Sequence, residues 1–196
     1  MATAATTHTD ADLAYLRAEF RTLDEICAGR PESPDHVRRL IEERRLPRPS
    51  YVLADGTEFV PPDYFDLVDA AGGPNGLRGE YEQRYREALA EYGLPFDADL
   101  FERRWNAYLD GISGICMREV TPKTIVRKRL LIDEIERLIG DPRPEDIQWQ
   151  DDLRRHVDEL DAIEKPFAPD YDRANFAPTR DTYIRDVQRA YRQIWE

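Results

Sequence analysis

One stretch of the chain, from Trp105 to Lys128, concentrates residue types that could do chemistry. Gly111 and Gly114 interrupt a helical pattern there, and a break in an otherwise helical protein frequently lines a cavity or an interface. Cations near a helix N-terminus at Thr121, together with its free amide donors, suit a carboxylate, sulfate or phosphate. The ligand-binding residues that we predict here are Tyr108, Asp110, Cys116, Arg118, Lys123 and Arg127.

Other interpretations of these residues stay open. The cations could pair with Asp133, Glu134 and Glu136 along the following helix instead of binding a ligand. Cys116 could act as a nucleophile, but no histidine lies nearby in the sequence, and a buried cysteine more often has a structural role. The sequence therefore assigns no catalytic residue.

Motifs for metal, phosphate and hydrolase chemistry are missing from the sequence. There is neither Cys-x-x-Cys nor His-Glu-x-x-His spacing, so we expect no metal and no cofactor. The stretch GGPNGLRG lacks the Lys-Ser/Thr pair of a phosphate-binding loop and is interpreted as a linker. No Gly-x-Ser-x-Gly elbow supports a hydrolase triad.

The histidines are few and scattered: His8, His36 and His156. His156 lies four residues after Asp152 and three before Glu159, on one helix face, and these carboxylates could tune an acid–base imidazole. A solvated charged helix face explains the same spacing.

Three short helices and a hairpin are predicted in the first third of the chain. The first helix follows Asp10, the second starts at a capping box of Thr22 and Glu25, and the third starts at Ser33 and Pro34. The Asp-Gly pair in YVLADGTEFV is a strong hairpin signal. This order resembles the N-terminal winged helix-turn-helix of MerR-type regulators.

The charge of this module argues against DNA binding. A third helix in the major groove could offer phosphates the residues Arg38, Arg39, Arg44, Arg45 and Arg48. However, acidic residues are interleaved with these arginines, and the chain carries 40 Asp and Glu against 28 Lys and Arg, a formal net charge of -12. Such a charge disfavours the counterion release behind most nucleic-acid binding. We therefore expect the module to fold and dock proteins.

The remainder of the chain has almost purely helical patterns, with a Gly-Gly-Pro at residues 72–74 as the predicted boundary. We predict a mainly α protein with a disordered tail at residues 1–9 and a winged-helix-like module with a short β-hairpin at residues 10–73. A helical bundle would follow at residues 74–196, crossed by an extended, proline-rich segment at residues 165–179.

Aromatic residues of the bundle are candidates for a partner interface: Trp149, Tyr171, Phe176, Tyr183 and Trp195. Aromatic side chains are enriched in interface hot spots. Core packing explains at least half of such residues equally well.

Composition points to a cytoplasmic protein. No apolar run approaches the roughly 20 residues that span a bilayer, and the small, polar start of the chain does not read as a signal peptide. Cys27 and Cys116 lie far apart in the sequence, so we expect reduced thiols.

Three segments appear in a characteristic order: PSYVLADGTEFVPPDYFDLVDAAGG, WNAYLDGISGICMREVTPKTIVRKRLL and VDELDAIEKPFAPDYDRANFAPTRD. Together they are similar to a family of small actinobacterial natural-product biosynthesis proteins of unknown function. The resemblance spans nearly the whole chain and implies a role in specialised metabolism. It transfers no catalytic residue.

We expect a partner subunit that completes or assists a biosynthetic enzyme acting on a small anionic or carrier-bound intermediate. The expected partner is an enzyme encoded nearby, and nucleic acid and membrane are not expected partners. Two alternatives stay open: a helix-turn-helix transcription regulator with a ligand-sensing helical domain, and a stand-alone small biosynthetic enzyme.

Overall fold

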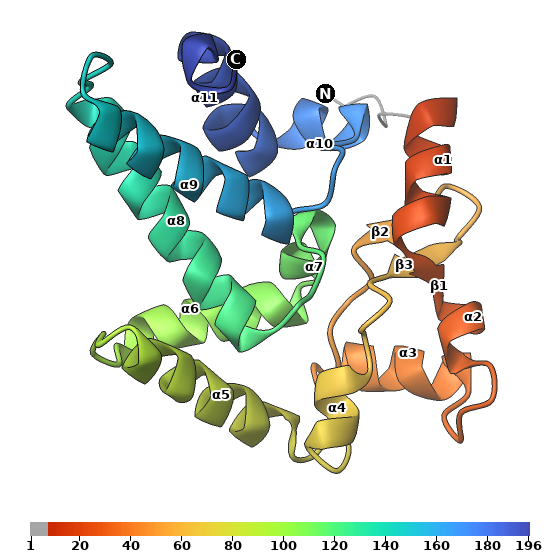
Figure 1. Ribbon diagram of the computed structural model, residues 1–196. Helices are drawn as coiled ribbons and strands as arrows, with labels where there is room; N and C mark the ends of the chain where they lie inside the picture. Colours follow the sequence, from red (N-terminus) through yellow and green to blue (C-terminus); the bar gives the residue numbers. More distant parts are fainter. Residues whose placement is uncertain (1–7) are drawn as a thin grey trace, which may run out of the picture. The chain divides into compact units, whose positions relative to one another are not determined.

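The computed structural model describes residues 8–196 and shows a mainly α-helical protein with one small antiparallel sheet (Figure 1). The fold class expected from the sequence is thereby confirmed. The tail predicted at residues 1–9 lies outside the described residues, apart from His8 and Thr9. Among the helices of residues 8–196, none combines the length and the apolar composition needed to cross a membrane.

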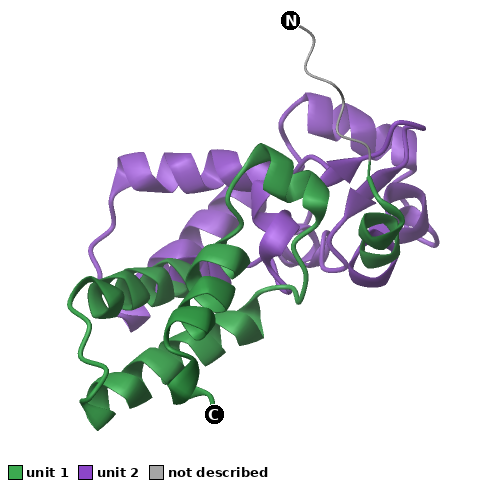
Figure 2. Ribbon diagram, turned by 90° about the horizontal axis from the view of Figure 1, so that it is seen from above, with its two compact units in different colours: residues 1–15, 127–196 green, residues 16–126 purple. Residues whose placement is uncertain are grey.

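The chain folds into two compact units, coloured separately in Figure 2. Unit 1 comprises residues up to Tyr15 together with residues 127–196, and unit 2 comprises residues 16–126. Gly73, the predicted boundary, lies inside unit 2. Hydrogen bonds join the sequence on both sides of it, such as that from Arg48 N to Leu109 O at 2.8 Å. The glycine turn therefore separates two helices rather than the two units.

The first elements of the chain are α1 (Asp10–Glu19), β1 (Arg21–Thr22), α2 (Leu23–Cys27), α3 (Pro34–Glu42), β2 (Tyr51–Val52) and β3 (Glu58–Val60). Strand β3 is the centre of the sheet, with β1 and β2 antiparallel on its two sides. The β2–β3 hairpin turns at Gly56, whose φ of 85° is readily adopted only by glycine. The predicted hairpin and its Asp-Gly turn are confirmed.

The capping box at the start of α2 is formed as the sequence predicts. The Thr22 hydroxyl accepts a hydrogen bond from Glu25 N at 3.1 Å, and the Glu25 carboxylate accepts one from Thr22 N at 2.8 Å. Two amides at the helix start are thereby satisfied.

Thr22→Ala is expected to lower the free energy of unfolding by about 1 kcal/mol, because it removes the acceptor for the Glu25 amide. Thr22→Ser keeps this acceptor and serves as the control. Urea denaturation of the variants measures the difference. An equal loss in both variants would mean that the Thr22 methyl group, and not the cap, carries the effect.

The rest of unit 2 is helical, with α4 (Asp66–Ala70), α5 (Leu77–Glu91), α6 (Ala98–Leu109) and α7 (Ile112–Cys116). Helices α5 and α6 pack through aromatic rings placed three or four residues apart on each helix. The Tyr81 ring centroid lies 5.2 Å from that of Trp105 and 5.0 Å from that of Tyr108. This aromatic layer fixes the end of α6, where Tyr108 lies.

Unit 1 contains most of α8 (Pro122–Gly140), together with α9 (Ile147–Ile163), α10 (Asp170–Asn175), the π-helix η1 (Arg180–Arg185), α11 (Asp186–Ala190) and the 3-10 helix η2 (Arg192–Ile194). Leu131 and Ile135 of α8 and Leu153 and Leu160 of α9 are buried in its apolar core, with Ile184 of the π-helix. The C-terminal elements therefore close a core that α8 and α9 begin.

The segment at residues 165–179 is less extended than its prolines suggest. It contains α10, since residues 170–177 are free of proline and leave room for a short helix. Asp12 of α1 accepts a hydrogen bond from Asp170 N at 2.9 Å, at the first residue of α10. Burial alone would raise the pKa of Asp12, but the amide donors of Thr9 and Asp170 outweigh it and lower this pKa.

Candidate functional site

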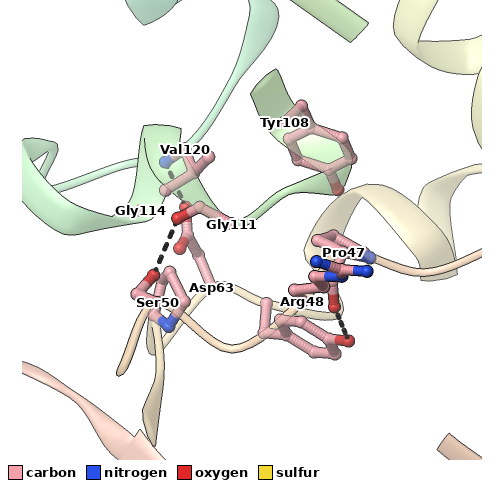
Figure 3. A pocket seen from close by; sticks show the side chains of 10 residues that line it. Pro47, Arg48, Ser50, Asp63, Tyr108, Gly111, Gly114 and Val120 are labelled. Carbon is pink, nitrogen blue, oxygen red and sulfur yellow. Dashed lines mark hydrogen bonds between the residues drawn. The ribbon is translucent and has the colours of Figure 1, made fainter. Parts of the chain in front are cut away.

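A small pocket in unit 2 lies where Gly111 and Gly114 interrupt the helices (Figure 3). Its walls come from the segment before β2, the segment after β3, the end of α6 and α7. About 20 Å³ of the pocket is open to the centre of a water molecule, which is room for about one water. An organic substrate does not fit inside it.

Both positions lack room for a side chain, because backbone atoms lie close to Gly111 and side-chain atoms lie close to Gly114. Gly111 has a φ of 74°, and a Cβ atom there would lie 2.5 Å from the carbonyl oxygen of Arg48. A Cβ atom on Gly114 would lie 2.4 Å from Ser50 Oγ and 2.6 Å from Pro61 Cγ. The Ser50 hydroxyl donates to Gly111 O at 3.1 Å (Figure 3). The absence of these side chains lets the segment before β2 pack directly on α7.

Most polar groups of the pocket bond to the protein itself. The Tyr64 hydroxyl donates to Pro47 O at 2.7 Å, and Val120 N donates to the Asp63 carboxylate at 2.6 Å (Figure 3). The Tyr108 side chain also lines the pocket and is 4% exposed. Burial, assisted by the charge of Asp63, raises the pKa of Tyr108. Tyr108 is therefore a neutral donor that suits one bound water, not a base.

The six predicted ligand residues do not gather around this pocket. Tyr108 lines it, whereas Asp110 pairs with Arg44 at 3.0 Å. In unit 1, Arg127 pairs with Glu159. Cys116 is half-buried on α7, Arg118 is exposed and Lys123 is exposed at the start of α8.

The start of α8 is poorly suited to bind an anion, because its donors already have partners within the protein. Thr121 and Thr124 each donate a backbone amide to the other's hydroxyl at 3.1 Å. Lys123 lies 2.8 Å from a carboxylate oxygen of Glu91. The adjoining groove, with a volume of about 620 Å³, is lined by three carboxylates, of Glu80, Glu87 and Glu91, against two cations, of Arg84 and Lys123. These carboxylates oppose the binding of an anionic group.

His156 does not form the acid–base pair that its spacing permits. Its Nδ1 atom lies 2.6 Å from the backbone oxygen of Asp152, which can only accept, so Nδ1 carries a proton. The Asp152 carboxylate pairs with Arg155. The hydrogen bond from Arg127 lowers the pKa of Glu159. Both carboxylates therefore have arginine partners, and the imidazole is a buried part of α9.

Residues 8–196 hold no group of three or more His, Cys, Asp or Glu side chains that could bind a metal ion.

The aromatic residues predicted for a partner interface divide between core and surface. Trp149 is buried and donates its indole NH to Leu138 O at 3.1 Å. Tyr183 and Trp195 pack against the core of unit 1. The Tyr171 ring stacks on the His8 ring, with 4.3 Å between the two ring centroids. Phe176 keeps 44% of its surface exposed, so it is the most accessible of the five.

Sequence reasoning missed a buried ionic cluster in unit 1. Glu164 is fully buried and lies 2.8 Å from Lys128 Nζ, and its carboxylate also accepts from the Thr179 hydroxyl. Next to it, the buried Arg180 pairs with Asp161. The sequence feature that could have pointed to this cluster is the small number of lysines, since the chain has three lysines against 25 arginines. Two of these lysines, Lys128 and Lys165, are largely buried.

These features define a mainly α-helical protein with a hairpin-bearing N-terminal part and a charged centre in its C-terminal bundle. Residues 77–192 match the model of a family of unknown function, DUF6058. The match covers more than half of the chain, which therefore belongs to this family. Comparisons with curated proteins and with solved structures give no match. The matched region runs from α5 to η2 and includes the Glu164 cluster.

Proposed function

We propose that this chain is a cytoplasmic accessory protein of natural-product biosynthesis. It docks on a partner enzyme through a winged-helix-like part, residues 10–73. The order of elements supports the likeness, because α2 and α3 are followed by the β2–β3 hairpin, with β1 completing the sheet. The biosynthetic role rests on the resemblance of the three sequence segments.

The observation that carries the docking role is the pairing of the arginines on and after α3. Arg38 lies 2.7 Å from Glu58 and 2.8 Å from Asp35. Arg44 and Arg45 each lie 3.0 Å from a carboxylate oxygen, of Asp110 and Glu43 respectively. These carboxylates hold three of the five arginines that a DNA reader would offer to phosphates.

The remaining charges do not restore a basic face. Arg39 and Arg48 have no carboxylate partner within the described part of the chain, but Asp55 lies at the hairpin turn and Glu42 is exposed on α3. DNA binding needs several uncompensated cations, since each phosphate contact releases about one counterion. A surface with interleaved charges of both signs suits a protein partner, because opposite charges across an interface fix its register.

Co-purification tests the docking role. The tagged full-length chain, isolated from its native host, is expected to elute with an enzyme encoded beside it. Arg39→Glu combined with Glu42→Lys reverses two exposed charges of α3 and should lose the enzyme. The control is Arg189→Glu, an exposed change on α11. Retention of the enzyme by the α3 variant, or elution of the wild-type chain alone, would contradict the proposal.

A second experiment separates this role from transcription regulation. Fluorescence anisotropy with duplex DNA is expected to show no sequence-selective binding by the wild-type chain at about 0.15 M salt, where exposed charges are screened beyond about 8 Å. Asp35→Asn combined with Glu43→Gln and Glu58→Gln frees arginines, so it should raise low-salt affinity and steepen its salt dependence. Tight, sequence-selective binding by the wild-type chain would favour the regulator instead.

A further inference from the structure

We propose that unit 1 contains a buried binding site for a neutral hydroxyl group, with the Glu164 carboxylate as its acceptor. Glu164 directly follows α9 and is fully buried. Its Oε1 atom lies 2.8 Å from Lys128 Nζ and also accepts from the Thr179 hydroxyl. Lys128 donates to Thr179 Oγ1 at 2.9 Å as well. The three side chains thus form a closed triangle around one carboxylate oxygen.

The second oxygen of Glu164, Oε2, is buried and accepts no hydrogen bond from residues 8–196. Leaving a buried acceptor of this kind without a donor costs about 1–3 kcal/mol, and more when the group is charged. Buried polar atoms are nearly always satisfied by protein, water or ligand. Oε2 therefore calls for a donor from outside the described chain.

The charge around Glu164 determines which donor fits. Lys128 already balances Glu164, and Arg180 is balanced by Asp161. Two further residues of opposite sign, Lys165 and Asp172, are also buried in unit 1. A cationic ligand would leave a net buried charge, which is expensive, and an anion would face the carboxylate directly. The group at Oε2 is therefore a neutral donor, of which an O–H group is the most compact.

The backbone around Glu164 has features of a functional loop. Arg180 donates Nε to Lys165 O and Thr179 donates to Glu164, so both ends of the segment at residues 165–179 are held together. Compact loops with joined ends are frequently functional. The π-helix η1 begins at Arg180, and π-helical turns are frequent at functional sites. The Lys128 side chain is 13% exposed, so the site reaches solvent at this lysine.

Three probes of one shape test this site: isopropanol, a neutral donor; acetone, which only accepts; and isopropylammonium, a cation. Saturation-transfer NMR on the full chain is expected to show isopropanol binding at least tenfold more tightly than the other two. Equal binding of all three probes, or no binding of isopropanol, would overturn the site. So would a long-lived water at Glu164 that isopropanol does not displace, because the site would then hold water only.

A variant makes the assignment specific to Glu164. Lys128→Met combined with Glu164→Gln keeps the centre neutral and replaces the free acceptor by an amide donor. The probe preference is expected to reverse, so that acetone binds more tightly than isopropanol. An unchanged preference would place the probes elsewhere and contradict the proposal. This test is independent of partner docking, which uses α3 in unit 2.

Discussion

Gly111→Ala is expected to lower the free energy of unfolding by more than about 3 kcal/mol, a large effect for one added methyl group. The left-handed φ of 74° costs an alanine about 1–2 kcal/mol. The new Cβ atom would also lie 2.5 Å from Arg48 O and 2.9 Å from Pro49 O. Both contacts are with backbone, so relief requires the chain to move and to weaken the hydrogen bond from Arg48 N to Leu109 O.

Gly79→Ala in α5 is the matched control for Gly111→Ala. A Cβ atom at Gly79 meets nothing within 4 Å, and alanine favours a helix over glycine by about 1 kcal/mol. Gly79→Ala should therefore stabilise the protein. Guanidinium denaturation compares the two variants. A loss below about 1 kcal/mol for Gly111→Ala would show that α7 and the segment before β2 separate easily.

Lys128→Met is expected to cost about 3–5 kcal/mol of stability, because it leaves Glu164 as a buried charge without its cation. Glu164→Leu should lower the free energy of unfolding by a similar amount, because it leaves the Lys128 ammonium without its carboxylate partner. The double variant is expected to recover most of the loss, because an apolar pair of similar volume avoids both unpaired charges. Coupling between the two sites should therefore exceed about 2 kcal/mol in a double-mutant cycle.

An exposed pair provides the control for this cycle. Arg154 lies 3.6 Å from Asp158 on α9, and about half of each side chain is exposed. Arg154→Met should change stability by less than about 0.5 kcal/mol, as is usual for surface pairs. Additive losses for Lys128 and Glu164 in urea denaturation would contradict their role as a buried pair.

Structure that depends on residues close together in the sequence could be predicted. The capping box of Thr22 and Glu25 and the hairpin turn at Gly56 are formed as expected. Helix α6, Ala98–Leu109, buries Phe101, Trp105 and Tyr108 on one apolar stripe, in keeping with the helical pattern of this part of the sequence. Each of these signals acts within a few residues, through a cap, a turn or a helical apolar stripe.

Structure that depends on distant residues could not be predicted. Lys128 and Glu164 are 36 positions apart, and no periodic pattern connects them. The pairing of Arg44, which follows α3, with Asp110, which follows α6, likewise joins distant residues, and the sequence pattern alone places Asp110 in an anion site. At the C-terminal end of the predicted helical bundle, residues 180–194 are divided into π, α and 3-10 turns. Such turns follow from packing rather than from local preference.

The assembly of unit 1 from both ends of the chain has a consequence for the newborn protein. Unit 2 is one continuous stretch, so a ribosome completes its residues early, at about 5–20 residues per second. The start of α1, by contrast, needs late partners: the Asp12 carboxylate binds the amide of Asp170, and Tyr15 packs on Phe167. The start of α1 is therefore synthesised more than 150 residues before Phe167 and Asp170, and is held in place only after these two residues have been made.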